Sequence, residues 1–365
     1  MNRLNELNSL GQSVWLDYIS KSIIFNGELK RIIKEYKIKG ITSNPTIFQK
    51  AITNSNDYDK LIKTLSHNKK LNNKILYEKL AIIDIQNAAD IMMPIYNTTK
   101  KLDGYVSLEV SPYLAYDTKN TINEAKRLWK TISRPNLMIK IPATNEGIDA
   151  IRYLISYGIN INITLLFSVN YYKKAINAFI EGLQYRIKKN KDISFIASVA
   201  SFFISRIDNK IDKIIDKKSN KKLKTYLGQI AIANAKLAFQ IQKKIHNSNI
   251  WTILAEKGAQ KQRLLWASTS TKNCKYSDIL YVENLIGKQT VNTISLKTLN
   301  AFQKYGKVQI TIENSKINAE EIFNILESEN ILFEKITNDL LNEGIVLFQK
   351  AFDKILISLE KKQKF

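Results

Sequence analysis

The sequence predicts an α/β protein built as a (β/α)8 barrel (a TIM barrel) with additional helices. Short β-branched runs alternate with helical segments and form no series of consecutive hairpins, which is typical of a parallel sheet. Eight such runs are present, the number that closes a barrel. An open, doubly wound sheet is the alternative. However, no run is followed by the GxGxxG or GxxxxGK[ST] turns that bind nucleotide phosphates.

The eight predicted strands are short apolar runs bounded by polar or turn residues. They are SVWLD (13–17), IKGITSN (38–44), GYVSLEVS (104–111), LMIKIPA (137–143), ININITLLF (159–167), SFIASVASF (194–202), RLLWAST (263–269) and TVNTIS (290–295). A typical barrel needs about 250 residues, whereas this chain has 365. We expect one domain, 1–365, with the surplus in helical insertions at about 46–103 and 205–258 and in C-terminal helices at about 299–365.

The composition is that of a globular chain with an excess of positive charge. Apolar residues make up 44% and charged residues 24%, which excludes a disordered or collagen-like chain. Lys and Arg number 56 against 33 Asp and Glu, a formal charge of +23. The densest basic run, 210–224, keeps isoleucines at helical spacing, so we predict one long amphipathic helix with a solvated lysine face. This pattern favours solubility over contact with RNA.

Cysteine usage and hydropathy bear on the compartment. The single cysteine, Cys274, excludes an intramolecular disulfide and a multi-cysteine metal site. The N-terminal segment lacks the apolar core of a signal peptide. The longest charge-free stretch, 153–172, contains Asn160, Asn162 and Asn170, whose amides a lone membrane helix could not satisfy. We therefore expect a cytoplasmic protein with no membrane span.

Polar residues occur inside several predicted strands, where a parallel sheet usually has continuous apolar runs. In 104–111, Leu108 lies on one face while Glu109 lies on the other, by the two-residue period of a strand. The apolar faces can pack on surrounding helices, so the polar faces must point into the barrel. Asp17, Glu109 and Lys140 then bring charges inward near the carboxyl ends of three strands, where barrels of this kind carry their active sites.

Two interpretations of Lys140 are open. One is a buried structural ion pair with Glu109. The other is a nucleophile, because burial and a neighbouring cation favour a neutral amine over the charged form. A neutral lysine beside two carboxylates can form a Schiff base with a ketone. The histidines, His67 and His246, fall in helical stretches away from the strand ends, so we expect carboxylates to act as general acid and base.

Several motifs resemble those of transaldolases, in the same order along the chain. They are VWLD (14–17), GITSNPTIF (40–48), LEVSP (108–112), IKIPATNEG (139–147), INITLLFS (161–168) and ASFFISRID (200–208). The length and the later WASTSTKN (266–273) resemble the longer-chain bacterial branch. The resemblance spans about residues 10 to 300, and IKIPAT followed by INITLLFS is its most specific part.

The resemblance implies a role for each candidate residue. By it, Lys140 forms the Schiff base, Glu109 acts as acid and base through a water held near Thr164, and Asp17 takes the proton from the C4 hydroxyl. The implied substrate ligands are Asn44 and Asn162 for the dihydroxyacetone hydroxyls, Ser201 and Arg206 for the phosphate, and Lys272 as a second cation.

Each ligand also has a structural alternative. Asn44 could be a turn residue before Pro45, and Arg206 a surface arginine on a helix. Asn162, Thr164 and Ser201 could be packing residues of the barrel layers. Asp17 could cap a helix that begins near Tyr18.

The resemblance further implies the reaction. A transaldolase of the pentose phosphate pathway moves a dihydroxyacetone unit from sedoheptulose 7-phosphate to glyceraldehyde 3-phosphate, giving erythrose 4-phosphate and fructose 6-phosphate. Sugar phosphates are then the partners, with no metal and no organic cofactor, and the chain is a monomer or a homodimer. Phe203 stands where transferases of the family tend to carry Phe and aldolases Tyr. The alternatives are an aldolase that cleaves fructose 6-phosphate and a basic scaffold that binds RNA or another polyanion.

Overall fold

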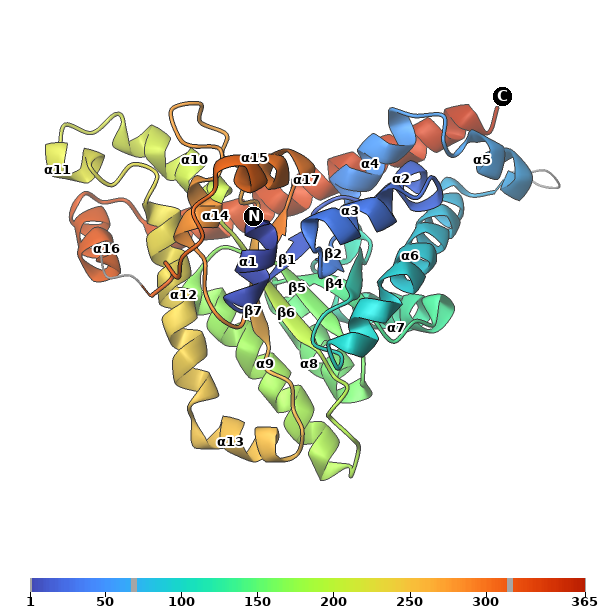
Figure 1. The fold of residues 1–365 in the computed structure, drawn as a ribbon, viewed down its shortest axis with the longest axis horizontal. Coiled ribbons are helices and arrows are strands. Elements are labelled where there is room, and N and C mark those ends of the chain that lie inside the picture. The colour runs from blue at the N-terminus through green and yellow to red at the C-terminus, as the bar shows by residue number, and fades with distance from the viewer. Residues whose placement is uncertain (1, 67–70, 314–317, 365) are drawn as a thin grey trace.

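The barrel is closed by eight parallel strands. The computed structural model describes residues 2–66, 71–313 and 318–364. Each strand pairs with the next along the chain, and β8 pairs back with β1. Figure 1 shows the strands with helices around them. The strands are β1 (Gln12–Leu16), β2 (Gly40–Ile41), β3 (Tyr105–Glu109), β4 (Leu137–Pro142), β5 (Ile161–Leu166), β6 (Ser198–Phe203), β7 (Arg263–Ala267) and β8 (Thr290–Ile294). The predicted fold class and all eight predicted strands are confirmed.

Strand β2 is much shorter than the segment 38–44 predicted for it. Only Gly40 and Ile41 have strand geometry, and they pair with β1 and β3. A methyl group placed on Gly40 would lie 2.4 Å from the indole of Trp15, so only glycine permits this close approach. The chain leaves the sheet beyond Ile41 and enters a helix at Pro45.

Helices before, between and after the strands complete the barrel. They are α1 (Arg3–Ser9), α2 (Lys21–Phe25), α3 (Glu28–Tyr36), the 3-10 turn η1 (Pro112–Leu114), α7 (Thr118–Ile132), α8 (Asn145–Tyr157), α9 (Val169–Lys188), α14 (Leu280–Asn284) and α15 (Leu296–Tyr305). Helices α8 and α9 flank β5, so the charge-free stretch 153–172 is a helix end, a strand and a helix start. Among the described helices, none is long and apolar enough to cross a membrane.

The three segments predicted to hold the surplus residues are helical. Their helices are α4 (Pro45–Thr53), α5 (Asp59–Ser66) and α6 (Asn73–Thr98) after β2, then α10 (Ser205–Ile215), α11 (Lys221–Lys224), α12 (Ile230–His246) and α13 (Asn249–Glu256) after β6, and α16 (Ala319–Ser328) and α17 (Phe333–Lys362) beyond α15. Whether the chain behaves as one cooperative domain stays a prediction.

The prediction of one long helix through 210–224 was wrong. Helix α10 ends at Ile215, and the short α11 begins at Lys221. Asn220 is the N-cap of α11, and its side chain accepts a hydrogen bond from the backbone N–H of Leu223. Ser219 and Asn220 favour turns and caps over helix interiors because their side chains compete for backbone hydrogen bonds. This local preference outweighed the isoleucine spacing.

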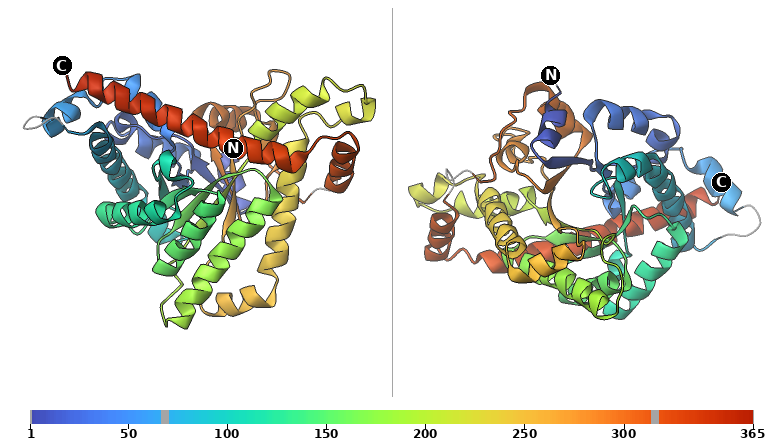
Figure 2. Two further views of the ribbon diagram at one scale, coloured as in Figure 1. Left: turned by 180° about the vertical axis from the view of Figure 1, so that it is seen from behind. Right: turned by 60° about the horizontal axis from the view of Figure 1, so that its bottom comes forward.

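The C-terminal helix α17 lies across one end of the barrel. It packs on α4, α6, α10, η1 and the end of β5. Helices α4 and α10 and the turn η1 follow the carboxyl ends of β2, β6 and β3, so a helix that contacts all three must cross that end of the sheet. Figure 2 shows α17 as the red helix that spans the molecule over the strands.

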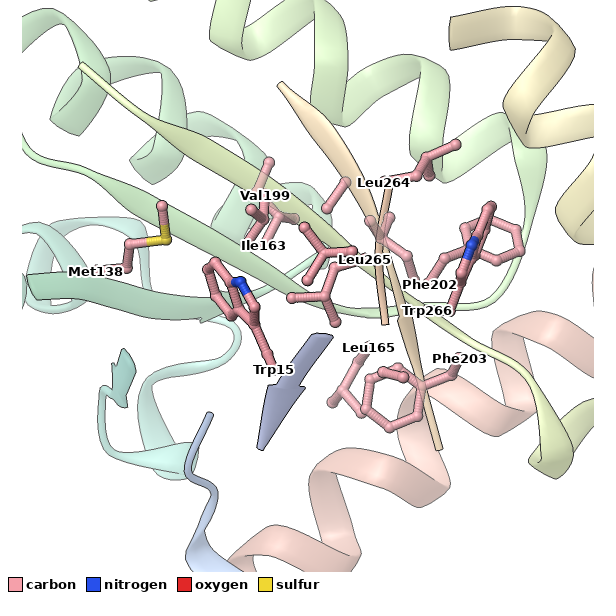
Figure 3. Close-up of a cluster of buried hydrophobic side chains, with 14 of the residues drawn as sticks. Trp15, Met138, Ile163, Leu165, Val199, Phe202, Phe203, Leu264, Leu265 and Trp266 are labelled. Carbon is pink, nitrogen blue, oxygen red and sulfur yellow. The ribbon is translucent and has the colours of Figure 1, made fainter. Parts of the chain in front are cut away.

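The opposite end of the barrel is closed by a buried polar network. Arg263 Nη2 lies 2.9 Å from Asp103 Oδ1, and Trp15 Nε1 donates to the same oxygen over 3.0 Å. Ser13 donates to Asp103 Oδ2 and accepts from Arg263 Nη1. Between this network and the carboxyl end, apolar side chains fill the barrel, with Trp15 and Leu265 at its centre (Figure 3).

Candidate active site

The strand register places three of the predicted residues in one row. Glu109 of β3 pairs with Lys140 of β4, and Lys140 pairs with Asn162 of β5. Paired residues of neighbouring strands point to the same face of a sheet. All three therefore face the barrel interior near its carboxyl end, as the alternation of polar and apolar residues predicts.

Lys140 is enclosed by its partners at the carboxyl end of the barrel, which we call the mouth. Its Nζ lies 3.3 Å from Glu109 Oε2, and the two side chains are 5% and 4% exposed. Nζ also donates a hydrogen bond of 3.0 Å to the backbone carbonyl of Ser43, in the segment between β2 and α4. The ring of Phe348, on α17, lies 6.0 Å from the same nitrogen. The amine is thus held away from bulk solvent.

Burial acts on both predicted acids. Burial raises the pKa of Glu109, and the nearby Lys140 opposes the rise. Burial likewise raises the pKa of Asp17, while Lys140, the hydrogen bond from Thr42, and the cations Lys272 and Arg206 oppose it. Asp17 Oδ1 accepts that hydrogen bond from Thr42 Oγ1 over 2.9 Å. Each carboxyl group is therefore shifted toward the pH range in which it can exchange a proton.

Asp17 does not cap a helix. Helix α2 begins at Lys21, and its N-cap is Ser20. The alternative structural role for Asp17 is therefore wrong. Its side chain instead belongs to the charged cluster that includes Lys140, because that lysine has the largest effect of any charge on the pKa of Asp17.

Two buried oxygens near Lys140 are unsatisfied. Glu109 Oε2 and Thr164 Oγ1 have no hydrogen-bond partner among the residues that the structure describes. Thr164 is fully buried and pairs with Pro142 of β4, two residues beyond Lys140. Buried polar atoms of native proteins usually have a partner, often an ordered water. These two oxygens are therefore placed to bind an ordered water or a polar group of a ligand.

Asn162 and Ser201 lie in the same polar layer of the barrel interior. Ser201 Oγ donates to Asn162 Oδ1 over 2.7 Å, and Asn162 Nδ2 donates to Ser107 Oγ over 3.0 Å. Both are buried on adjacent strands. This chain of hydrogen bonds connects β3, β5 and β6, which is the packing role that the sequence left open beside ligand binding.

Asn44 caps a helix at the barrel mouth. It is the N-cap of α4, and its Oδ1 accepts a hydrogen bond of 3.0 Å from the backbone N–H of Ile47. Pro45 occupies the first helical position, where a missing N–H costs nothing. The turn role predicted for Asn44 is confirmed. Its amide nitrogen makes no hydrogen bond within the described part of the chain and remains able to donate to a ligand.

Arg206 and Lys272 provide positive charge at the mouth. Arg206 is the second residue of α10, as the sequence predicts for the segment after β6, and its guanidinium lies 5.3 Å from the Phe203 ring. It is partly buried, so it is not a simple surface arginine. Lys272 lies exposed in the loop after β7. Both cations act on the pKa of Asp17, so they face the same site.

The sequence reasoning missed several residues at this mouth. Ser43 supplies the carbonyl that binds Lys140, and Phe348 lies 208 positions after Lys140 in the chain. Ser205 and Ser268 join the start of α10 to the loop after β7, with hydroxyl oxygens 3.0 Å apart and Ser268 at φ 57°. A non-glycine residue with positive φ is a marker of strain, but it is invisible in the sequence.

His246, the histidine that the structure describes, offers no acid or base to the site. It ends α12, packs on Trp251, and has its pKa lowered to about 3 by burial. His67 lies outside the described residues. Within the described ranges, no group of three or more His, Cys, Asp or Glu side chains could hold a metal ion.

The fold and the site together define a class of protein. A closed (β/α)8 barrel that encloses a lysine, two carboxyl groups with raised pKa and an arginine at its carboxyl end has the layout of a barrel enzyme acting on an anionic substrate. A sequence model of the family described as Transaldolase/Fructose-6-phosphate aldolase matches residues 14–359. The chain belongs to this family.

Similar proteins carry the same family name over their whole length. A transaldolase of Trichodesmium erythraeum is 49% identical, with 100% of this chain and 98% of that protein covered. A protein named transaldolase 2 of a Nostoc species is 47% identical, with 100% and 98% covered. Another transaldolase 2, of Streptomyces coelicolor, is 39% identical, with 99% and 97% covered. The similarity therefore includes the mouth-forming helices as well as the strands.

Proposed function

We propose that this protein is a transaldolase of the pentose phosphate pathway. It transfers a dihydroxyacetone unit from sedoheptulose 7-phosphate to glyceraldehyde 3-phosphate and yields erythrose 4-phosphate and fructose 6-phosphate. The observation that carries the proposal is the buried Lys140 Nζ, 3.3 Å from Glu109 Oε2, at the carboxyl end of a closed barrel. Membership of the family and the names of its relatives support it.

Lys140 is the proposed nucleophile. Its neutral amine adds to the ketose carbonyl, and the resulting carbinolamine loses water to give an iminium ion. Glu109 protonates the departing hydroxyl, acting through a water that Thr164 also binds. Two features support this step. Burial raises the pKa of Glu109 toward the range in which it can donate a proton. Thr164 Oγ1 has no hydrogen-bond partner within the described chain, while Glu109 Oε2 contacts only Lys140 Nζ, as an ion pair.

Asp17 is the proposed base for carbon–carbon cleavage. It takes the proton of the C4 hydroxyl, the C3–C4 bond breaks, and its electron pair moves to the iminium to leave an enamine on Lys140. The raised pKa of Asp17 makes its carboxylate a better base than an exposed one. The enamine then attacks the aldehyde of glyceraldehyde 3-phosphate, and hydrolysis of the new iminium releases fructose 6-phosphate.

The remaining candidates bind the substrate. Asn44, Asn162 and Ser201 are proposed to hold the dihydroxyacetone hydroxyls, and Arg206 and Lys272 the phosphate. The assignment of Ser201 differs from the one that the resemblance implies, because its hydroxyl lies within the Asn162 layer, deep in the barrel. Arg206, at the start of α10, can bind an anion together with the helix N-terminal amides.

Borohydride trapping tests the nucleophile and the function together. Incubation with fructose 6-phosphate and reductant should add a dihydroxyacetone-derived mass to the peptide that contains Lys140. The Lys140→Ala variant should lose both the adduct and turnover. Lys236, a lysine of α12 that is 6% exposed and donates to the carbonyl of Thr311, provides the matched control. Its alanine variant should keep the adduct at Lys140, and an active enzyme without any adduct would contradict the proposal.

A second measurement separates transfer from cleavage. An aldolase would release free dihydroxyacetone from fructose 6-phosphate in the absence of an acceptor aldehyde, whereas a transferase keeps the unit on its lysine. Phe203 supports transfer, because its ring stacks with Arg206 and carries no hydroxyl that could protonate the enamine. A cytoplasmic location and the oligomeric state stay predictions.

A further inference from the structure

Helix α17 forms a roof over the candidate active site. Of its buried residues, Phe348 lies above Lys140, and Gly344, one turn earlier, lies beside β5 and α10. Side chains from the barrel rim hold the helix in place. Tyr116 donates to Asn342, Tyr113 donates to Asp353, and Lys210 of α10 binds Glu343 at 2.6 Å.

Gly344 lies close to two residues at the candidate site, Leu165 and Arg206. A methyl group on its Cα would lie 2.9 Å from Leu165 Cδ2 and 3.3 Å from Arg206 Nη1. The first of these distances is shorter than two carbon atoms can approach without a shift. The backbone of α17 can therefore rest on Leu165 and Arg206 only because position 344 has no side chain.

Glycine is otherwise a poor choice at this position. It is among the weakest helix formers, yet it occurs inside a helix of 30 residues, Phe333–Lys362. Gly344 is also buried, so exposure to solvent does not account for it. The close approach to Leu165 and Arg206 is the feature of the structure that requires it.

The side chain of Leu165 is 1% exposed, so its end can move only into space that neighbouring side chains fill. The φ of Leu165 is 59°, a conformation that non-glycine residues rarely adopt, and the pairing of β5 with β6 shifts register between Ile163 and Leu166. The residue before it is Thr164, whose oxygen belongs to the candidate site. A methyl group added at 344 would thus displace the end of the Leu165 side chain, the guanidinium of Arg206 or α17 itself.

We propose that Gly344 is a positioning residue that sets the distance between α17 and Arg206 and so controls how tightly the site holds the phosphate end of its substrate. This inference rests on the proposed function, in which Arg206 binds phosphate. It makes the C-terminal helix, and not only the barrel loops, part of the phosphate site.

The Gly344→Ala variant tests the proposal. The KM values for both sugar-phosphate substrates should rise about tenfold, and the inhibition constant of inorganic phosphate should rise by a similar factor, while kcat changes less. A merely structural glycine would not produce this division between KM and kcat. Unchanged KM values and phosphate affinity in a folded Gly344→Ala variant would overturn the proposal.

Two further variants keep the test decisive. Gly182 also lies inside a helix, α9, and a methyl group there would meet Ile155 at 2.6 Å, far from the roof contacts. Gly182→Ala should therefore lower stability and leave phosphate affinity unchanged. Adding Leu165→Ala to Gly344→Ala removes the atom that the new methyl meets, and phosphate affinity should return toward that of the unaltered chain. This double variant also serves if Gly344→Ala does not fold, and a double variant that still binds phosphate weakly counts against the proposal.

Calorimetric titration with inorganic phosphate does not depend on turnover. If the unaltered chain binds phosphate but transfers no dihydroxyacetone unit, the proposed function fails, whereas the comparison with Gly344→Ala still decides the role of the roof. If the unaltered chain binds no phosphate, the role proposed for Gly344 fails as well.

Discussion

The two ends of the barrel each contain a buried ion pair, and the two pairs differ in how completely their atoms are satisfied. At the base, both oxygens of Asp103 accept hydrogen bonds, from Trp15, Ser13 and Arg263. At the mouth, Lys140 and Glu109 lie 3.3 Å apart, and Glu109 Oε2 has no hydrogen-bond partner in the described chain. The base pair is complete within the protein, whereas the mouth pair leaves bonding capacity for a ligand.

This difference separates a structural pair from a reactive one. A buried charge is tolerated when hydrogen bonds replace those lost to water, which describes the base. Compensation at the mouth is less complete: Lys140 and the hydrogen bond from Thr42 oppose the effect of burial, yet the pKa of both Glu109 and Asp17 stays raised. Acids with perturbed pKa values gathered around one buried lysine are more typical of catalysis than of a scaffold. The same fold therefore contains one charge pair that maintains it and one that we propose to perform chemistry.

The Lys140→Met variant should give the largest effect at the mouth. Turnover should fall by about a thousandfold or more, because the variant removes the group that forms the covalent intermediate. The unfolding free energy should fall by less than the roughly 3–5 kcal/mol that breaking a fully compensated buried pair costs. Burial raises the pKa of Glu109, and losing Lys140 removes the charge that opposes this rise, so protonation of the carboxyl limits the cost.

Urea unfolding and the two-substrate assay measure these two effects, with Lys236→Met as the control that should keep activity. A Lys140→Met variant that loses several kcal/mol of stability would assign the mouth pair to the scaffold.

The Asp103→Asn variant should give the opposite result at the base. Removing one charge leaves Arg263 buried without its counter-ion, at a cost of about 3–5 kcal/mol of unfolding free energy. The kcat of the folded fraction should not change, because the base network lies at the other end of the barrel. Combining Asp103→Asn with Arg263→Met removes the unpaired charge and should recover part of the loss. If the single variant is as stable as the unaltered chain, the base network is not the structural element inferred here.

The sequence predicts the charged residues of the mouth better than those of the network at the base. Lys140 and Glu109 lie inside strands whose alternation shows that they point inward, and their motifs resemble those of a known family. Asp103 gives no such signal, because it precedes β3 in a loop and its partner Arg263 starts a strand 160 positions later. Only the closed order of strands, with its register, brings the two together.

The roof also depends on information that the sequence does not carry. The apolar spacing of α17 indicates a buried face but not the surface that buries it. Gly344 belongs to no sequence motif. Its role depends on the contact with Leu165, whose backbone has a positive φ. The sequence does contain a signal for the break between α10 and α11, because Ser219 and Asn220 favour turns. Local patterns thus predicted most elements, whereas contacts between distant segments required the fold.

The Glu109→Gln variant should give the smallest effect, and it is the most specific test of the difference between the mouth pair and the base pair. Burial raises the pKa of Glu109 above its ordinary value, so the stability that its neutral form contributes is present at low pH and is lost as the pH rises through the folded-state pKa. Glutamine stays neutral throughout. The variant should therefore match the unaltered chain near pH 4 and exceed it at pH 8, by about 1.4 kcal/mol for each unit by which the pKa is raised.

Urea unfolding at several pH values measures this difference in unfolding free energy. Leu347→Ala, at a side chain that is 45% exposed on the outer face of α17, adds no titrating group, so its curve should run parallel to that of the unaltered chain. A Glu109→Gln advantage that shrinks as the pH rises would mean that Lys140 stabilises the carboxylate more than burial penalises it. The mouth pair would then resemble the base pair, and its proposed readiness to exchange protons would have no physical cause.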